Sequence, residues 1–355
     1  MRKVWIDIVA AKDVRYFKTL RDRASNMDFF FTARKHAEIY GMLKMWKLKH
    51  KIIGSHGGPT LEGKLIASAN RTFKLSKLIS NLEKRPDVFV SFSSPEGCRV
   101  AFGLRIPIIC LNDTPHAVHV ARLTLPLADK VIVPAAIGKE RFIELGAREE
   151  AIIEFNGVDE VAWVKDFQPD TRVMEKLDLS PTDKIVVVRP EEAFAAYLTG
   201  KVKLEDSPSI KIIERLLSWS GDAKIVVLPR YKEQKKVLVE KFRRKVKIPS
   251  KTIDALSLVA FSEVVLTGGG TLGREAALMG IPAISYFPGE QLDVNAFLIR
   301  RGFPLWEEKN PERAADIALE ILSNPDSYKR DVSSLIEDLE DPIDVIIKTI
   351  EEITE

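Results

Sequence analysis

Short β-branched or aromatic segments alternate with longer helical patterns along almost the whole of this 355-residue chain. The alternation is typical of parallel sheets whose strands are joined by helices that cover both faces. The fold class is therefore α/β, with two parallel-sheet halves in tandem. The expected strands are 3–8, 28–32, 51–54, 87–92, 106–111 and 129–133 in the first half, and 184–189, 223–228, 263–267 and 281–287 in the second.

The length of the chain favours two domains, because a single hydrophobic core rarely grows to this size. Residues 166–183 contain two prolines around a short helical pattern and are typical of a connection between domains. We therefore expect an N-terminal Rossmann-like domain over 1–165 and a C-terminal Rossmann-like domain over 184–340. Acidic helices are expected around 311–322 and 342–353.

The composition argues against a disordered chain, a disulfide-bonded framework and a membrane-spanning protein. A hydrophobic content of 45% and a charged content of 30% are ordinary for a globular chain. Only Cys98 and Cys110 occur, both in apolar segments without zinc-type spacing, which argues against a disulfide framework and for a reducing compartment. No apolar segment reaches the length of a membrane span, and the first residues lead directly into an expected strand. We therefore expect a cytoplasmic protein.

The net charge of +3 is unevenly distributed. Residues 41–85 contain ten Lys or Arg and two Asp or Glu, a net charge of +8, whereas residues 307–355 contain fifteen acidic and five basic side chains. Apolar residues accompany the basic ones, which indicates amphipathic helices with a basic face. This face is either an ordinary solvated surface or a surface for an anionic or lipid-linked acceptor at the inner membrane surface. Sequence-specific nucleic-acid binding is not expected.

The strongest functional motif is a run of three glycines between a buried strand and a helix. Residues 268–270 are glycines, and the helix is expected to begin near Thr271. Glycines let the backbone approach an anion closely, and a helix N-terminus offers unpaired N–H groups to phosphate. Glu275 lies about one turn inside the helix, where its carboxylate could reach ribose hydroxyls. The alternative is a tight strand-to-helix turn without a ligand.

Gly268, Gly270 and Gly273 also have the spacing of the dinucleotide-binding fingerprint, with Asp293 further along the chain. In a Rossmann domain the acidic residue should end the next strand, whereas Asp293 follows a strand that we expect to end near Phe287. An NAD(P)-dependent dehydrogenase is therefore an alternative from a different chemical class.

A second group of polar residues follows the expected strand 106–111. Asp113, His116 and His119 place a carboxylate and two imidazoles beyond the carboxyl end of a strand, which suits proton transfer and contact with a sugar. The two histidines, one helical turn apart, could instead cap or pack, and a zinc site would need further ligands. Asp113 and His116 are therefore candidate catalytic residues, and His119 is a candidate sugar contact.

Two further charged residues lie at expected strand or helix ends. Asp13 could act as a base, or could simply cap the helix that follows the first strand. Arg189 ends the expected strand 184–189 and could clamp a pyrophosphate, with an ion pair to an acidic residue as the alternative.

Over nearly its whole length the chain resembles a known family. It is identified as a member of domain-of-unknown-function family 354, a family common in archaea. Residues 268–296 also resemble the C-terminal half of GT-B glycosyltransferases, in particular the N-acetylglucosaminyl transferase of lipid II synthesis, and non-hydrolysing UDP-N-acetylglucosamine 2-epimerases. The family hallmarks stand here at residues 93–96, 109–117, 122–129, 188–190 and 228–230.

The resemblance implies a GT-B-like fold, in which two Rossmann-type domains face a cleft and residues 341–355 pack back on the first domain. It implies a nucleotide sugar as substrate, no tightly bound cofactor and no metal. The loop at 7–16 lacks the glycines usual after the first strand of such transferases, so the resemblance does not fix the acceptor site or the base. The residues that it implies for the ligand are Gly268, Gly269, Gly270 and Thr271 on the pyrophosphate, Glu275 on the ribose, and Gln291 or Asp293 near the sugar.

The leading hypothesis is glycosyl transfer from a UDP-sugar donor by direct displacement, with Asp113 or His116 as base and Asp13 as a third candidate. Arg189 and the glycine run would stabilise the diphosphate. The alternatives are a nucleotide-sugar 2-epimerase, a dehydrogenase, and a nucleotide-binding protein that has lost catalysis.

Overall fold

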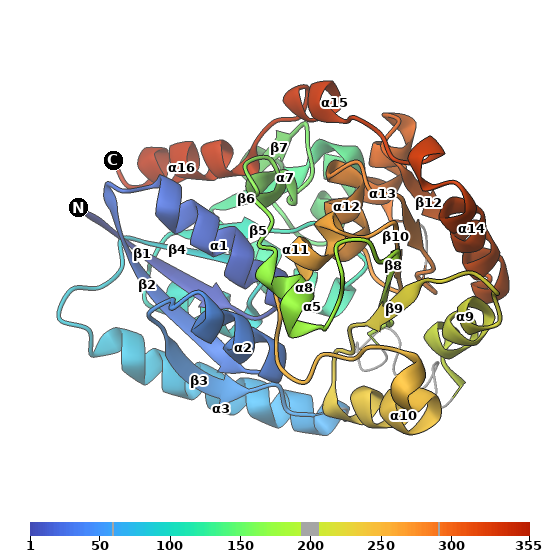
Figure 1. Ribbon diagram of the computed structural model, residues 1–355. Coiled ribbons are helices and arrows are strands. Elements are labelled where there is room, and N and C mark those ends of the chain that lie inside the picture. Colours follow the sequence, from blue (N-terminus) through green and yellow to red (C-terminus); the bar gives the residue numbers. More distant parts are fainter. Residues whose placement is uncertain (59, 193–205, 290–291) are drawn as a thin grey trace. The chain divides into compact units, whose positions relative to one another are not determined.

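The computed structural model describes residues 1–58, 60–192, 206–289 and 292–355. The chain forms two compact units. The N-terminal unit comprises Met1–Trp163 and Leu339–Glu355, and the C-terminal unit comprises Val164–Asp338 (Figure 1). None of the helices in these described ranges has the length and apolar character that crossing a membrane requires.

The N-terminal unit contains a seven-stranded sheet with the order β3-β2-β1-β4-β5-β6-β7. Every neighbouring pair of strands is parallel. The central strands are fully buried at their centres, as both faces of the sheet are covered by helices (Figure 1). The strands are β1 (Arg2–Ile8), β2 (Met27–Lys35), β3 (Lys51–Ser55), β4 (Val88–Phe92), β5 (Ile108–Leu111), β6 (Lys130–Pro134) and β7 (Ile152–Phe155).

Helices α3 and α4 of this unit begin at hydroxyl side chains that cap them. The Thr60 hydroxyl accepts a hydrogen bond from the Gly63 N–H at the start of α3, and the Ser94 hydroxyl does the same for Gly97 in α4. The helices are α1 (Ala11–Arg23), α2 (Ala37–Met45), α3 (Leu61–Ser80), α4 (Pro95–Gly103), α5 (Val118–Thr124), α6 (Lys139–Ile143), α7 (Val161–Val164) and α16 (Pro342–Ile353), with 3-10 turns η1 (Leu125–Leu127), η2 (Ala135–Ile137) and η3 (Glu149–Ala151).

The last helix, α16, belongs to the N-terminal unit, although it follows the C-terminal unit in the sequence. Asp341 caps α16 by accepting from the Ile343 N–H, and its carboxylate also pairs with Arg23 of α1 at 2.5 Å. Ile343, Ile346 and Ile350 are buried on one face of α16. The C-terminal helix is thus held on α1 by apolar packing and by one ion pair (Figure 1).

The C-terminal unit contains a five-stranded parallel sheet with the order β12-β11-β10-β8-β9. Its strands are β8 (Ile185–Arg189), β9 (Lys224–Val227), β10 (Val264–Thr267), β11 (Ala283–Ser285) and β12 (Leu305–Glu307). Its helices are α8 (Arg172–Lys176), α9 (Pro208–Leu217), α10 (Lys232–Phe242), α11 (Ala255–Ala260), α12 (Thr271–Leu278), α13 (Asp293–Arg300), α14 (Pro311–Ser323) and α15 (Ser333–Glu337), with 3-10 turns η5 (Arg243–Lys245) and η6 (Pro325–Ser327).

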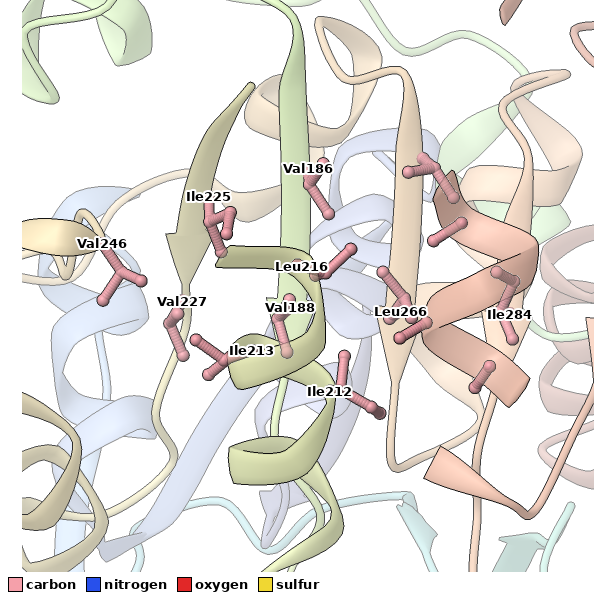
Figure 2. Packing of buried hydrophobic residues seen from close by; sticks show 14 of the residues in the cluster. Val186, Val188, Ile212, Ile213, Leu216, Ile225, Val227, Val246, Leu266 and Ile284 are labelled. Atoms are coloured by element: carbon pink, nitrogen blue, oxygen red, sulfur yellow. The ribbon is translucent and has the colours of Figure 1, made fainter. Parts of the chain in front are cut away.

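One face of this sheet packs on α9 and α14. Figure 2 shows Ile212, Ile213 and Leu216 of α9 packed toward Val186 and Val188 of β8. These side chains are almost fully buried, and a buried side chain of this size contributes about 1.5–3 kcal/mol. The core therefore fixes the carboxyl edge of the sheet, where the strands lead into loops.

All the expected strands are confirmed, and the structure contains two further strands that were not predicted. β7 and β12 were not predicted, because both are edge strands of only four and three residues and each contains a glutamate. The strand expected over 281–287 is shorter than predicted, since only Ala283–Ser285 pairs with its neighbours.

Candidate functional site

At the carboxyl edge of the N-terminal sheet, one lysine lies among carboxylates. Lys12, in the first turn of α1, places its Nζ atom 2.6 Å from Asp113 Oδ1 and 3.2 Å from Asp159 Oδ2. The same ammonium lies 4.2 Å from the centre of the Phe92 ring. Asp113 follows β5, and Asp159 and the fully buried Glu160 follow β7. We call Lys12, Asp113, Asp159 and Glu160 the lysine-carboxylate cluster.

Burial and the charges of neighbouring side chains both shift the pKa values in this cluster. Burial alone would lower the pKa of Lys12, but the nearby Asp113, Asp159 and Glu160 carboxylates raise it overall, so the ammonium stays charged. Burial, together with repulsion from Asp113 and Glu160, raises the pKa of Asp159 to about 7 despite the attraction of Lys12. One carboxyl group of the cluster therefore exchanges its proton near neutral pH, which is the property of a general acid or base.

Asp13 is placed as a helix cap. Its Oδ2 atom accepts hydrogen bonds of 2.8 Å from the N–H groups of both Val9 and Ala10, which lead into α1. Burial raises its pKa to about 6, although the two backbone hydrogen bonds oppose the shift. These contacts support the capping role that the sequence left open, and a catalytic role for Asp13 stays a prediction.

Asp13→Asn is expected to flatten the dependence of stability on pH between about pH 4 and pH 6. Because the folded-state pKa is about 6 and the ordinary value is 3.8, the folded chain binds this proton more tightly than the unfolded chain does. The parent therefore loses stability as the pH rises through this window, by about 2–3 kcal/mol. Asparagine keeps an oxygen for Val9 and Ala10 but does not titrate. Urea unfolding of both proteins across the window measures the slope, and equal slopes would contradict the shift.

Next to this edge lies a fully buried ion pair between Asp7 of β1 and Arg71 of α3. Arg71 donates to both carboxylate oxygens, at 2.6 and 2.9 Å, and its Nε donates to the Ile53 carbonyl. Hydroxyls of Ser94 and Thr32 also donate to Asp7, each at 2.6 Å. Burial by itself would raise the pKa of Asp7. Arg71 and the hydrogen bonds lower this pKa by more than burial raises it, so it lies below its ordinary value. This network holds the starts of the loops in place.

The loop after β5 is also fixed by hydrogen bonds. Asn112 donates to the Ser93 hydroxyl at 3.0 Å, and its Oδ1 accepts from the Thr114 N–H at 2.8 Å. Asp113 is thereby held toward Lys12. His116 is half-buried in the turn that follows, and His119 is exposed on α5.

In the C-terminal unit, the loop after β10 contains the three glycines. The Gly268 N–H donates to the Arg189 carbonyl at 2.9 Å, and a Cβ atom at Gly268 would lie 2.7 Å from the backbone of Glu191. A Cβ atom at Gly269 would lie 2.7 Å from the Arg230 guanidinium, and one at Gly270 would lie 2.3 Å from the Arg274 guanidinium. None of the three adopts a left-handed backbone conformation. Gly268 is therefore required by the close approach of the Glu191 backbone, whereas a Cβ atom at Gly269 or Gly270 would meet the end of an arginine side chain.

Three arginines surround this loop. Arg189 donates to the Leu228 carbonyl at 3.0 Å, and Arg230 donates through Nε to the Pro190 carbonyl at 2.9 Å. Arg274 donates to Asn295 Oδ1 at 3.2 Å. Guanidinium groups beside a glycine backbone and a helix N-terminus provide the chemistry that recognises phosphates. We call the three arginines, the glycines at 268–270 and Thr271 the cationic glycine loop.

The other residues predicted for the ligand lie near this loop or outside the described part of the chain. Thr271 is the first residue of α12, and Glu275 is buried one turn further along that helix. Asp293 begins α13 and does not end a strand, so the acidic position of the dinucleotide fingerprint is not reproduced. Gln291 lies outside the described residues. Within those ranges, no group of His, Cys, Asp and Glu side chains has the arrangement of a metal site.

Several site residues were missed by the sequence analysis. Lys12 and Asp159 carried no motif, and their only signal was a position just beyond a strand. Arg230 and Arg274 stood inside recognised segments but were given no role. Arg71 was counted in the basic surface of residues 41–85, whereas it is buried against Asp7.

Solved structures from several organisms have the same fold. UDP-GlcNAc 2-epimerase from Methanocaldococcus jannaschii, in complex with UDP-GlcNAc and UDP, has a TM-score of 0.73 at 16% identity over 99% of both chains. The epimerase from Neisseria meningitidis, bound to UDP-GlcNAc, has a TM-score of 0.74 at 12% identity, covering 99% of this chain and 100% of that chain. Alr3699/HepE from Anabaena, with UDP and glucose, has a TM-score of 0.60 at 15% identity over 99% of both chains.

At such identities the likeness shows the fold, and the prediction of a GT-B-like α/β fold with two parallel-sheet units is confirmed. In sequence, the chain is 37% identical to the uncharacterized protein MJ0665 of M. jannaschii over 305 residues. The matched segment covers 84% of this chain and 85% of that protein. The family model described as "Protein of unknown function (DUF354)" matches residues 2–355. The chain therefore belongs to the DUF354 family.

Proposed function

We propose that the C-terminal unit binds the diphosphate of a nucleotide sugar of the UDP type through the cationic glycine loop. The observation that carries this proposal is the placement of the Arg230 and Arg274 guanidiniums against glycines that open the eight-residue helix α12. Guanidinium groups bind phosphate oxygens bidentately, and the helix N-terminus favours negative charge. The solved relatives that share the fold were crystallised with UDP or UDP-GlcNAc, which fits a ligand of this class.

The chemistry on the sugar is assigned to the lysine-carboxylate cluster of the N-terminal unit. Asp113 is oriented by its ion pair with Lys12 at 2.6 Å, so it is the leading candidate for the base, ahead of His116. In glycosyl transfer the acceptor hydroxyl oxygen bonds to the anomeric carbon, and its proton passes to the Asp113 carboxylate. The nucleoside diphosphate leaves with the electron pair of the broken bond, and its added charge is stabilised by the arginines.

A second candidate function is epimerisation of a nucleotide sugar at C2. The observation that favours it is the presence of two buried carboxyl groups in one cluster, Asp113 and Asp159, of which burial raises the pKa of Asp159 to about 7. An epimerase needs both a base and an acid near the sugar. Inversion at C2 breaks a carbon–hydrogen bond, so the product formed in deuterated water would carry deuterium at C2. Glycosyl transfer leaves that bond intact and releases UDP only when an acceptor is added. Mass spectrometry of UDP-GlcNAc incubated with the protein separates the two reactions.

The nucleotide site itself is tested by Glu275→Ala, which is expected to weaken UDP binding roughly ten- to a hundred-fold. Glu275 lies about one turn inside α12, beyond the glycines, so a ribose would lie near it if the pyrophosphate binds at the helix N-terminus. Inorganic pyrophosphate, which lacks a ribose, should bind the variant and the parent alike. Calorimetric titration with both ligands makes the comparison.

Glu312→Ala is the matched control, because it removes an exposed carboxylate from the first turn of α14 in the same unit. This control should bind UDP and pyrophosphate as the parent does. Equal UDP affinity in the parent and in Glu275→Ala would remove the proposed ribose contact. A loss of affinity for both ligands with a lowered melting temperature would make Glu275 a structural residue.

A further inference from the structure

Helix α3 carries large apolar side chains that are exposed as well as apolar side chains that are buried. Its inner face is buried through Arg71, Leu75 and Ile79, and the helix packs against β3 and α4 (Figure 1). Its outer face carries Leu61, Leu65, Ile66 and Phe73, whose exposed fractions are 72%, 71%, 53% and 60%. We call these four side chains the α3 stripe.

The stripe is not explained by the packing of the N-terminal unit. A helix on the surface of a globular protein usually has one apolar face toward the core and a polar face toward water. Single exposed apolar residues are normal, but a group of large ones on one helix marks a surface that is covered by a partner. Residues 61, 65, 69 and 73 recur at every fourth position, so neighbouring members of this row lie one turn apart, and the row of Leu61, Leu65, Ala69 and Phe73 winds slowly around α3.

The charge of the residues around the α3 stripe distinguishes a second copy of the chain from an anionic surface as its partner. Lys74 and Lys77 are exposed beside it, and the Lys77 ammonium lies 4.5 Å from the centre of the Phe73 ring. The surrounding residues 41–85 carry ten basic and two acidic side chains, of which only Arg71 is buried in an internal ion pair. A symmetric pair of chains would bring this basic region against its own copy, which is repulsive. An anionic surface neutralises it.

We propose that α3 docks the N-terminal unit on an anionic lipid bilayer. The stripe enters the boundary between headgroups and acyl chains, while Lys74 and Lys77 extend to the lipid phosphates. Docking goes beyond the nucleotide-sugar function proposed above and does not rest on it. It would place an acceptor carried on a lipid in the same layer as the N-terminal unit.

Co-sedimentation of the full chain with vesicles tests the docking. Binding should be strong with mixed phosphatidylcholine and phosphatidylglycerol, weak with phosphatidylcholine alone, and reduced by salt, because these charges are screened over about 10 Å at 0.1 M. Leu65→Asp should lower the partition coefficient about tenfold or more. Replacing both Lys74 and Lys77 by Gln should lower it about twenty-fold, since each lysine contributes about fivefold.

Leu123→Asp is the matched control, because it makes the same change at a leucine on α5 that is 59% exposed, and it should bind vesicles as the parent does. Glu275→Ala should also bind them normally, which separates docking from the nucleotide site. Sedimentation equilibrium without lipid provides the opposing outcome. Equal binding to neutral and anionic vesicles, retained binding by Leu65→Asp, or a dimer that Leu65→Asp dissociates would each overturn the proposal.

Discussion

Asp113→Asn is expected to slow turnover of the nucleotide sugar about a hundred- to ten-thousand-fold, the range that a proton-transfer residue contributes. The side chain is buried and its Oδ1 atom lies 2.6 Å from Lys12 Nζ, so the carboxyl group faces a fixed direction. Asparagine has the same shape but accepts no proton. Affinity for UDP should be unchanged, because the cationic glycine loop that is proposed to bind the diphosphate lies in the other unit.

Turnover is measured as UDP release, and in deuterated water as deuterium incorporation, for the parent and the variant. Asp28→Asn is the control, because it changes an exposed aspartate of β2 at the opposite edge of the same sheet. It should leave the rate unaltered. Full activity in Asp113→Asn would move the base to Asp159 or His116, whereas equal losses of rate and of thermal stability would show that Asp113 acts in folding.

Arg71→Leu is expected to lower the free energy of unfolding of the N-terminal unit by about 3–5 kcal/mol. The substitution leaves Asp7 fully buried without the guanidinium that donates to both of its oxygens. Removing one partner of a buried pair costs much more than an exposed ion pair contributes, because the remaining charge has lost its solvent as well as its partner. Urea unfolding followed by circular dichroism measures the change.

Two further variants isolate the cause of this loss. Arg99→Leu removes an exposed arginine of α4 and should shift stability by no more than about 0.5 kcal/mol. Combining Arg71→Leu with Asp7→Asn removes both charges and should recover part of the loss. Because the pKa of Asp7 lies below its ordinary value, its contribution is present above about pH 4 and is lost on acidification. Equal losses in the single and double variants would assign the effect to packing.

The candidate site was only partly predictable. Asp113, Arg189 and the glycines at 268–270 were chosen from their positions along the chain, and the structure places them at or just beyond the carboxyl ends of strands β5, β8 and β10. The phosphate role of the glycines stays a prediction, and the structure adds that Gly269 lies against the guanidinium group of Arg230. No local pattern shows that a side chain from another loop will lie beside this glycine.

The sequence by itself determined which segments form the strand and helix layers of the protein. The signal for a strand or a helix is the spacing at which apolar residues recur along the chain, which is a local property. β1 and β10 were predicted within one residue of their observed ends for this reason. Tertiary structure alone decided which charges meet. Lys12 contacts a carboxylate 147 residues away, and Arg71 contacts one 64 residues away. Such pairs depend on the order of strands in the sheet and on burial, which changes both the partner of a charge and its pKa.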